Sequence, residues 1–189
     1  RFGGKMGPAF YGAEAAVQSG RFSRDEVMTW GALGYAGIKI DVTDDIKIQI
    51  DTELTYARGD EDPTDGNMET FEPIATFGHK YQGHIDLMTW KNSYAYKLGF
   101  AVWPMKWLSV HADAHAFWLV NRQDSWYSGT GAAIRGRQTN QSGNGTGHYV
   151  GSELDLYVKA KLLEKRVAIW AGYSHFFPGT YVRRTGRST

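Results

Sequence analysis

Two histidines and an aspartate at alternating positions are spaced in a way that could bind a metal ion. They are His111, Asp113 and His115, in the segment SVHADAHAF. If this segment is a strand, the three side chains point to the same face, and imidazole nitrogens are common zinc ligands. Alternating polar residues are also typical of a strand with one face in water, which is the simpler interpretation.

A second set of possible ligands lies in the acidic segment GDEDPTDGNMETFE, where carboxylate oxygens on a flexible loop could bind calcium. The candidates are Asp60, Asp62, Asp65 and Glu69. The spacing differs from that of an EF-hand, because Gly66 follows the third acidic residue one position late. We therefore expect a solvated turn and no required cofactor, with calcium as the one possible ion.

Residues suited to catalysis are not arranged as a catalytic site. Ser174 and His175 are adjacent, so their side chains would leave a strand on opposite faces. The chain has no cysteine and no Gly-Lys phosphate-binding motif, and its net charge of +1 gives no reason to expect nucleic acid as a partner. The sequence therefore predicts no enzyme. Arginines in the expected loops could instead guide an anion: Arg122, Arg135, Arg137, Arg183 and Arg184.

The elements that would position these residues are indicated by the stretch IKIQIDTELTYARGD, residues 46–60. Its even positions are mostly apolar and its odd positions mostly polar, which is the period of a β-strand with two different faces. Similar patterns predict seven strands, at 9–18, 27–42, within 46–60, and at 92–103, 107–120, 149–162 and 167–177. No apolar run is long enough for a membrane-spanning helix, and the mean hydropathy is −0.45.

The connections between the predicted strands alternate in length. Residues 43–45, 104–106 and 163–166 form short turns, whereas 59–86 and 121–148 are long loops, and 19–26 is intermediate. Successive antiparallel connections lie at opposite ends of a sheet, so this order gathers tight turns at one end and long loops at the other, as in outer-membrane barrels. A soluble barrel of the lipocalin kind could share the pattern.

Aromatic residues near both strand ends agree with the interfacial girdles of membrane barrels. Trp103 and Trp107 stand at the turn end, and the loop end has Trp90, Tyr94, Trp118, Trp126, Phe176 and Phe177. The alternative is that these large side chains fill the core of a soluble sandwich.

The polar strand faces would line the lumen of such a barrel. The lumenal candidates are Lys39, Asp41, Lys47, Asp51, Glu53, Lys97, His111, Asp113, His115, Glu153, Asp155, Lys159 and Lys161. Five are lysines and six are carboxylates, whereas a pore for a polyanion should be net positive. Selectivity would then come from the loop arginines or from other strands, or the cargo is not a polyanion. A salt-bridge lattice that stiffens the wall is an equally good explanation.

An open sheet cannot stand in lipid, because the backbone groups at its edges would lack hydrogen bonds there. Known single-chain bacterial barrels have even numbers of strands, about eight or more. We therefore expect an all-β, antiparallel, up-and-down transmembrane barrel. Residues 1–189 would form part of this single domain, without its N-terminal strands and its final C-terminal strand.

Several stretches together resemble the C-terminal half of the alginate export family of outer-membrane barrels, in the family's order. They are YGAEAAVQSGRF, GDEDPTDGNMETFEPIATFGHKYQGHIDLMTWKN, LGFAVWPMKWLSVHADAHAFWLV, DSWYSGTG, GSELDLYVKAKL and AGYSHFFPGTYV. The resemblance implies a monomeric barrel of about 18 strands, within the range known for such barrels, whose last strand ends in an aromatic residue. This chain stops at Thr189 without that residue, which favours the interpretation of a fragment.

The resemblance also implies a function: a passive porin-like export channel in the bacterial outer membrane, surrounded by lipid, for an anionic polysaccharide or small solutes. Two other functions stay open. The barrel could be a structural scaffold in a larger envelope complex, with periplasmic or envelope partner proteins. It could also be a soluble ligand-binding barrel, which would purify without detergent.

Overall fold

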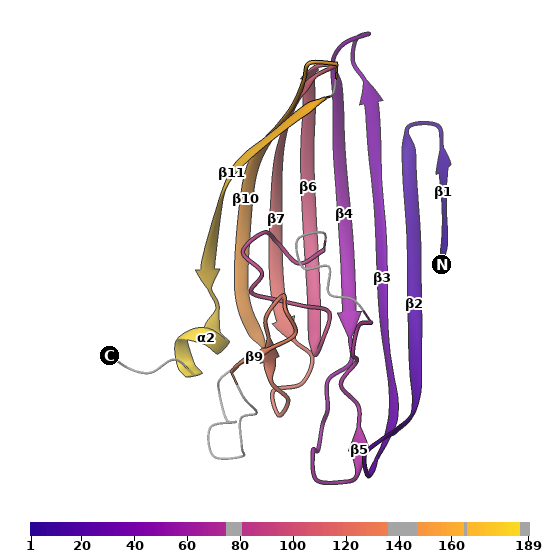
Figure 1. The fold of residues 1–189 in the computed structure, drawn as a ribbon, viewed down its shortest axis with the longest axis vertical. Coiled ribbons are helices and arrows are strands. Elements are labelled where there is room, and N and C mark those ends of the chain that lie inside the picture. The colour runs from indigo at the N-terminus through magenta and orange to yellow at the C-terminus, as the bar shows by residue number, and fades with distance from the viewer. Residues whose placement is uncertain (75–80, 136–146, 165, 186–189) are drawn as a thin grey trace.

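The structure, a computed structural model, describes residues 1–74, 81–135, 147–164 and 166–185 (Figure 1). Its elements are β1 (Phe2–Met6), β2 (Ala9–Phe22), β3 (Asp25–Asp41), β4 (Lys47–Ala57), β5 (Asn67–Met68), β6 (Ser93–Met105), β7 (Leu108–Leu119), β8 (Trp126–Tyr127), β9 (Ala133–Arg135), β10 (Tyr149–Leu162), β11 (Val167–Pro178) and α2 (Thr180–Thr185). Within these described ranges, no helix has the length and apolar character needed to cross a membrane.

The long strands form one antiparallel sheet in the order β1-β2-β3-β4-β6-β7-β10-β11, and β5 adds a short parallel pairing to β3. They run side by side in Figure 1, with β1 and β11 at the two edges. Each long strand pairs with the next long strand of the chain, which is an up-and-down topology. The sheet is not closed across the described residues and is consistent with part of a barrel wall. The predicted all-β fold and all seven predicted strands are confirmed.

Short elements at the N-terminal side and in the loops were not predicted. Strand β1 pairs with β2 through a turn at Gly7, which has φ of +58°. The expected connection at 19–26 is also mostly strand, because β2 and β3 are joined by Ser23 and Arg24 alone. Side chains on both faces of this hairpin end are exposed, so the sequence there lacks the alternation that reveals the other strands.

The two ends of the sheet carry different connections, as the sequence predicts (Figure 1). Short turns join β1 to β2, β3 to β4, β6 to β7 and β10 to β11, and all lie at one end, which we call the turn end. The long connections, from β4 to β6 and from β7 to β10, leave and rejoin the sheet at the other end, the loop end. The tight β2–β3 turn at the loop end is the exception.

The two faces of the sheet differ in chemistry. One face, which we call the outer face, presents large apolar side chains that the protein itself leaves uncovered. They include Ile38, Ile50, Leu98, Phe100, Val110, Leu156, Val158, Ile169 and Tyr173, each between 39% and 62% exposed. Charged residues occupy the alternate positions of the same strands, so they lie on the opposite face.

A row of aromatic rings crosses the outer face near the loop end. Trp30 stacks on Tyr56 with ring centroids 4.5 Å apart, and Tyr56 pairs across the strands with Tyr94. Tyr94 lies 5.4 Å from Trp118, which lies 5.5 Å from Tyr149. This row spans five neighbouring strands and has the arrangement of an interfacial girdle.

Several aromatic residues that were predicted to lie in the girdles lie instead on the charged face or under the loops. Trp103 is opposite Lys47 in the β4–β6 register, so it is on the charged face. Trp126 is buried under the loops, and the Trp90 indole N–H donates to the Tyr56 carbonyl, 2.8 Å away. Phe176 is opposite Glu153, again on the charged face. Residue type and strand-end position alone could not separate these roles.

A small hydrophobic core closes the loop end of the charged face. Its buried members are Met88, Ala95, Phe117, Leu119, Trp126, Val150 and Tyr181. They come from β6, β7, β10, α2 and the two long connections, so strands and loops pack as one unit.

Asp124, which is fully buried, ties the two long connections together. Its Oδ2 accepts the backbone N–H of Asp60 at 3.0 Å and the hydroxyl of Thr70 at 2.5 Å. Its Oδ1 accepts the backbone N–H of Ser125 at 2.6 Å and the hydroxyl of Tyr127 at 2.8 Å. Burial, together with this carboxylate, raises the pKa of the Tyr127 hydroxyl, so the hydroxyl stays protonated as a donor.

We expect Asp124→Ala to loosen residues 58–72 of the first long connection from the second. Buried donors left without an acceptor cost about 1–3 kcal/mol each, so the free energy of local opening should fall by at least about 2 kcal/mol. Hydrogen exchange of 58–72 and 120–127 would measure the change, with Asp62→Ala as the exposed control in the same connection. Unchanged exchange in Asp124→Ala would contradict the role of this carboxylate.

Candidate functional site

The residues predicted to line a lumen lie together on the charged face of the sheet, which we call the polar face. One cross-strand row joins Asp51, Gly99, Asp113 and Asp155. The next row towards the loop end joins Glu53, Lys97, His115 and Glu153. That this face surrounds a water-filled lumen stays a prediction.

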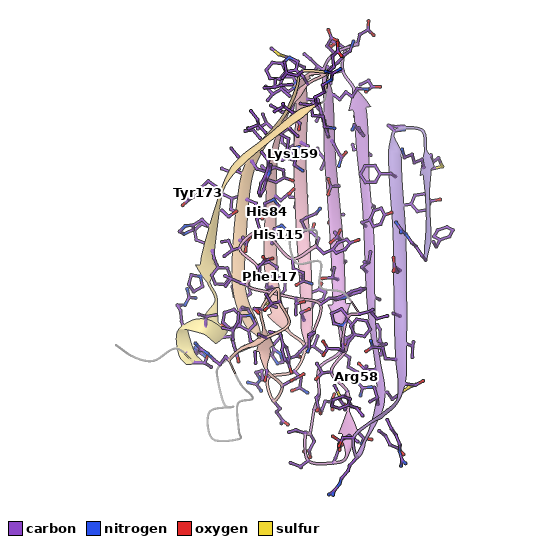
Figure 2. All side chains as sticks on the ribbon, viewed as in Figure 1. Arg58, His84, His115, Phe117, Lys159 and Tyr173 are labelled. Atoms are coloured by element: carbon purple, nitrogen blue, oxygen red, sulfur yellow. The ribbon has the colours of Figure 1, made fainter. Side chains whose placement is uncertain are left out.

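The charges of the polar face are divided into two zones along the strands. The basic zone, nearest the turn end, contains Lys39, Lys47, Lys159 and Lys161 with Asp41. The acidic zone, in the middle of the strands, contains Asp51, Glu53, Asp113, Glu153 and Asp155 with Lys97. Figure 2 shows this order, with Lys159 towards the turns and His115 and Phe117 progressively nearer the loops. The wall that looks mixed in sequence is therefore segregated in space.

Lys97 and a tyrosine hydroxyl engage two of the acidic-zone carboxylates. The Lys97 ammonium is 3.1 Å from Asp51, and the Tyr157 hydroxyl donates to Asp113 at 2.9 Å. Gly99 separates these two carboxylates, and a Cβ there would come within 2.8 Å of Asp51 and 2.9 Å of Asp113. Its missing side chain thus allows both aspartates to lean across β6.

A segment of the first long connection lies across the acidic zone. We call residues 81–91 the strap, and Figure 1 shows it in front of the sheet. The backbone N–H of His84 donates to Asp155 at 3.3 Å, and that of Ile85 to Glu153 at 2.9 Å. The Gln82 side-chain amide donates to the Thr55 hydroxyl at 3.2 Å. The strap therefore supplies a donor to one oxygen of each of the buried carboxylates Glu153 and Asp155.

Gly83 allows the strap to approach the sheet this closely. Its φ of +83° favours glycine, and a Cβ at this position would collide with the Glu153 carboxylate. The strap continues to Asp86 and Leu87, whose carbonyls accept the Gly129 N–H at 2.7 Å and the Trp126 indole N–H at 2.8 Å. Both ends of the strap are thus fixed, one to the sheet and one to the second long connection.

An aromatic column stands beside the strap on the polar face. The Tyr157 ring stacks between His111, at 4.6 Å, and His84 of the strap, at 4.9 Å. Trp103 meets His111 edge-on at 5.7 Å, and Trp170 lies 5.2 Å from His84. Strand alternation places Tyr157 on the same face as the lysines of β10, but no local pattern predicts that a loop histidine completes the stack.

The three residues considered as metal ligands, His111, Asp113 and His115, make separate contacts. His111 bonds the Ser109 hydroxyl at 2.9 Å and belongs to the column, whereas His115 lies 3.5 Å from Asp155 in the acidic zone. Across the described ranges, no three His, Cys, Asp or Glu side chains are placed to hold one metal ion.

The acidic loop residues considered for calcium serve instead to form turns. Asp60 accepts the Asp62 N–H at 3.2 Å, and Asp65 accepts the Asn67 N–H at 2.8 Å. Asp62 accepts the hydroxyl and backbone N–H of Thr64, and these hydrogen bonds lower the pKa of its carboxyl. Glu69 pairs with Arg58 at 2.5 Å. Asp62 and Asp65 thus fit the solvated turn, whereas Asp60 is buried.

Three of the predicted loop arginines lie around α2. Arg183 and Arg184 are in its last turn, and Arg183 donates to the Pro178 carbonyl at 2.8 Å. Arg135 of β9 bonds the Thr185 hydroxyl at the end of the helix. Arg122 lies in the second long connection, and Arg137 is outside the described residues.

A charged face with an apolar face behind it on an up-and-down sheet is the arrangement of a membrane barrel wall, and a comparison of families agrees. A sequence model for alginate export matches residues 1–189. The chain belongs to the alginate export family. This is a transport family of outer-membrane β-barrels, so polysaccharide export is supported at the level of the family. No curated protein matches the chain.

In this member of the alginate export family, we expect Gly83→Ala to push the Glu153 carboxylate away from the Ile85 N–H and loosen the strap. Gly66→Ala is a matched control, because Gly66 has φ of +81° but nothing within 4 Å of its Cβ position. Both variants carry similar backbone strain, about 1–2 kcal/mol. Hydrogen exchange at Ile85 should accelerate only in Gly83→Ala, and equal exchange in both would contradict the anchoring.

Proposed function

We propose that this chain forms part of the wall of an outer-membrane channel that conducts an anionic polysaccharide or small solutes. The observation that carries the proposal is the pairing of an uncovered apolar face with a charged face on the same long strands. Leu98 and Phe100, 49% and 44% exposed, alternate with Lys97 and Gly99 on β6. Lipid outside and water inside satisfy both faces of such a strand.

The outer face argues against a soluble ligand-binding barrel. Ile50, Val158 and Ile169 are 39–50% exposed, so contact with water would cost each of them about half of the roughly 1.5–3 kcal/mol that full exposure costs. The aromatic girdle lies on this same face near the loop end, where a membrane interface would lie. We therefore place lipid against the outer face.

The zones of the polar face suit an anionic cargo better than the total charge suggests. In the membrane orientation usual for outer-membrane barrels, the turn end faces the periplasm, so the basic zone would be met first by a cargo leaving the cell. Lysines there attract a polyanion along a low-dielectric wall. The acidic zone is screened from it by Lys97 and by the strap.

Planar-bilayer recording of the full-length protein tests the channel. We expect stepwise conductance from a barrel whose folding has been verified by its heat-modifiable gel mobility. A folded barrel that inserts but conducts nothing would contradict the channel and favour the scaffold in an envelope complex.

The strap should narrow this channel, because it occupies the polar face over two strand rows. Glu153→Ala removes the acceptor of the Ile85 N–H, so we expect a larger single-channel conductance than in the wild type. Glu26→Ala, which removes an exposed carboxylate 3.7 Å from Arg21, should conduct like the wild type. Equal conductance in all three proteins would show that the strap does not narrow the pore.

A further inference from the structure

Trp170 is an exposed indole on the polar face. It is opposite Lys159 in the β10–β11 register and is 57% exposed. Its neighbours on the same face of β11, Ala168 and Gly172, are small, so they leave the ring open. Ile169, at the adjacent position, faces outward, so β11 presents Trp170 to the polar side beside the basic zone, whereas Phe176 reaches the same face near the loop end.

Neither lipid contact nor core packing accounts for this tryptophan. The outer face already holds the apolar residues of β11, and the buried core lies at the loop end and does not include Trp170. Trp103, the other tryptophan at the column, differs because the Lys39 ammonium lies 3.8 Å from the centre of its ring. The Trp103 ring is thus covered by the Lys39 ammonium, whereas the Trp170 ring is exposed.

The column holds Trp170 in a defined orientation. Its ring is tilted by 54° from His84 and by 65° from Tyr157, at centroid distances of 5.2 and 6.2 Å. Tyr157 is itself fixed by stacking on His111 and by its hydrogen bond to Asp113. A ring positioned in advance loses little side-chain freedom when a ligand packs on it.

Charges beside Trp170 are arranged asymmetrically. Lys159 is directly opposite Trp170 in the β10–β11 register, with its ammonium 4.9 Å from the centre of the Tyr157 ring, and Lys161 lies in the next row of this face towards the turn end. On the loop-end side, Asp155 is engaged by the His84 N–H and lies 3.5 Å from His115. A ligand carboxylate next to Trp170 would therefore be directed to the lysines.

We propose that Trp170, Lys159 and Lys161 form a binding subsite for one acidic pyranose unit of a polysaccharide. The C–H face of the sugar ring packs on the indole, and its carboxylate pairs with the lysine ammonium groups. The subsite deepens the proposed function and rests on it for the placement of this face in a lumen. The subsite would give the polysaccharide a stacking contact at the basic zone as it passes through the channel.

Calorimetric titration of the full-length protein in detergent micelles tests the subsite, with an oligouronate and a neutral hexose oligosaccharide of equal length as probes. Trp170→Ala should weaken binding of both probes about tenfold, the range of aromatic stacking contacts. Lys159→Gln should weaken the oligouronate alone, and added salt should reduce that difference. Trp30→Ala, an exposed indole on the outer face, should bind both probes like the wild type.

Unchanged affinity in Trp170→Ala, or an equal loss in Trp30→Ala, would overturn the subsite. If Trp170→Ala does not fold, Trp170→Phe should retain most of the binding, and the selective loss in Lys159→Gln then decides. A wild-type protein that conducts but binds neither probe overturns the subsite and leaves the channel standing. A protein that binds the oligouronate but does not conduct overturns the channel and supports the subsite.

Discussion

Backbone hydrogen bonds between antiparallel strands determine which side chains share a row of this sheet, and the properties of the polar face follow from those rows. The pairing of Asp51 with Gly99 and of Gly99 with Asp113 brings carboxylates from β4 and β7 towards each other across a residue without a side chain. A shift of one residue in any strand would turn its charges to the apolar face. The observed register therefore keeps the charges on one face and aligns like charges of neighbouring strands, which produces the basic zone and the acidic zone.

The acidic zone creates a requirement that the strap satisfies. Buried carboxylates need hydrogen-bond donors, and leaving them without donors costs more than a neutral polar group would. Backbone N–H groups of His84 and Ile85 meet part of that need, with one hydrogen bond each to Asp155 and Glu153. The same contacts hold a loop against the wall and bring His84 to the aromatic column, so electrostatics, loop position and the proposed sugar contact depend on one another.

Much of the fold could be predicted from the sequence, because the alternation of strands such as Lys47–Ala57 is a local property. The segregation of charge could not, since it depends on which residue of β4 is opposite which residue of β6. The strap could not be predicted either. Its position depends on the close approach of the Gly83 backbone to Glu153 and on the hydrogen bond from the Ile85 backbone N–H, and residue types do not reveal such backbone contacts. Trp103 was misplaced for a similar reason, because an aromatic near a strand end can face either side.

The polar face should be in contact with water, and the outer face should be in contact with lipid. Because the chain contains no cysteine, single cysteines placed along β4 and β6 of the full-length protein in vesicles would report each side chain separately. A membrane-impermeant thiol reagent should label Lys47→Cys, Gln49→Cys and Asp51→Cys, while Ile50→Cys, Leu98→Cys and Phe100→Cys should react only with a lipid-soluble thiol reagent. Labelling without this two-residue period, or with the opposite phase, would contradict the account.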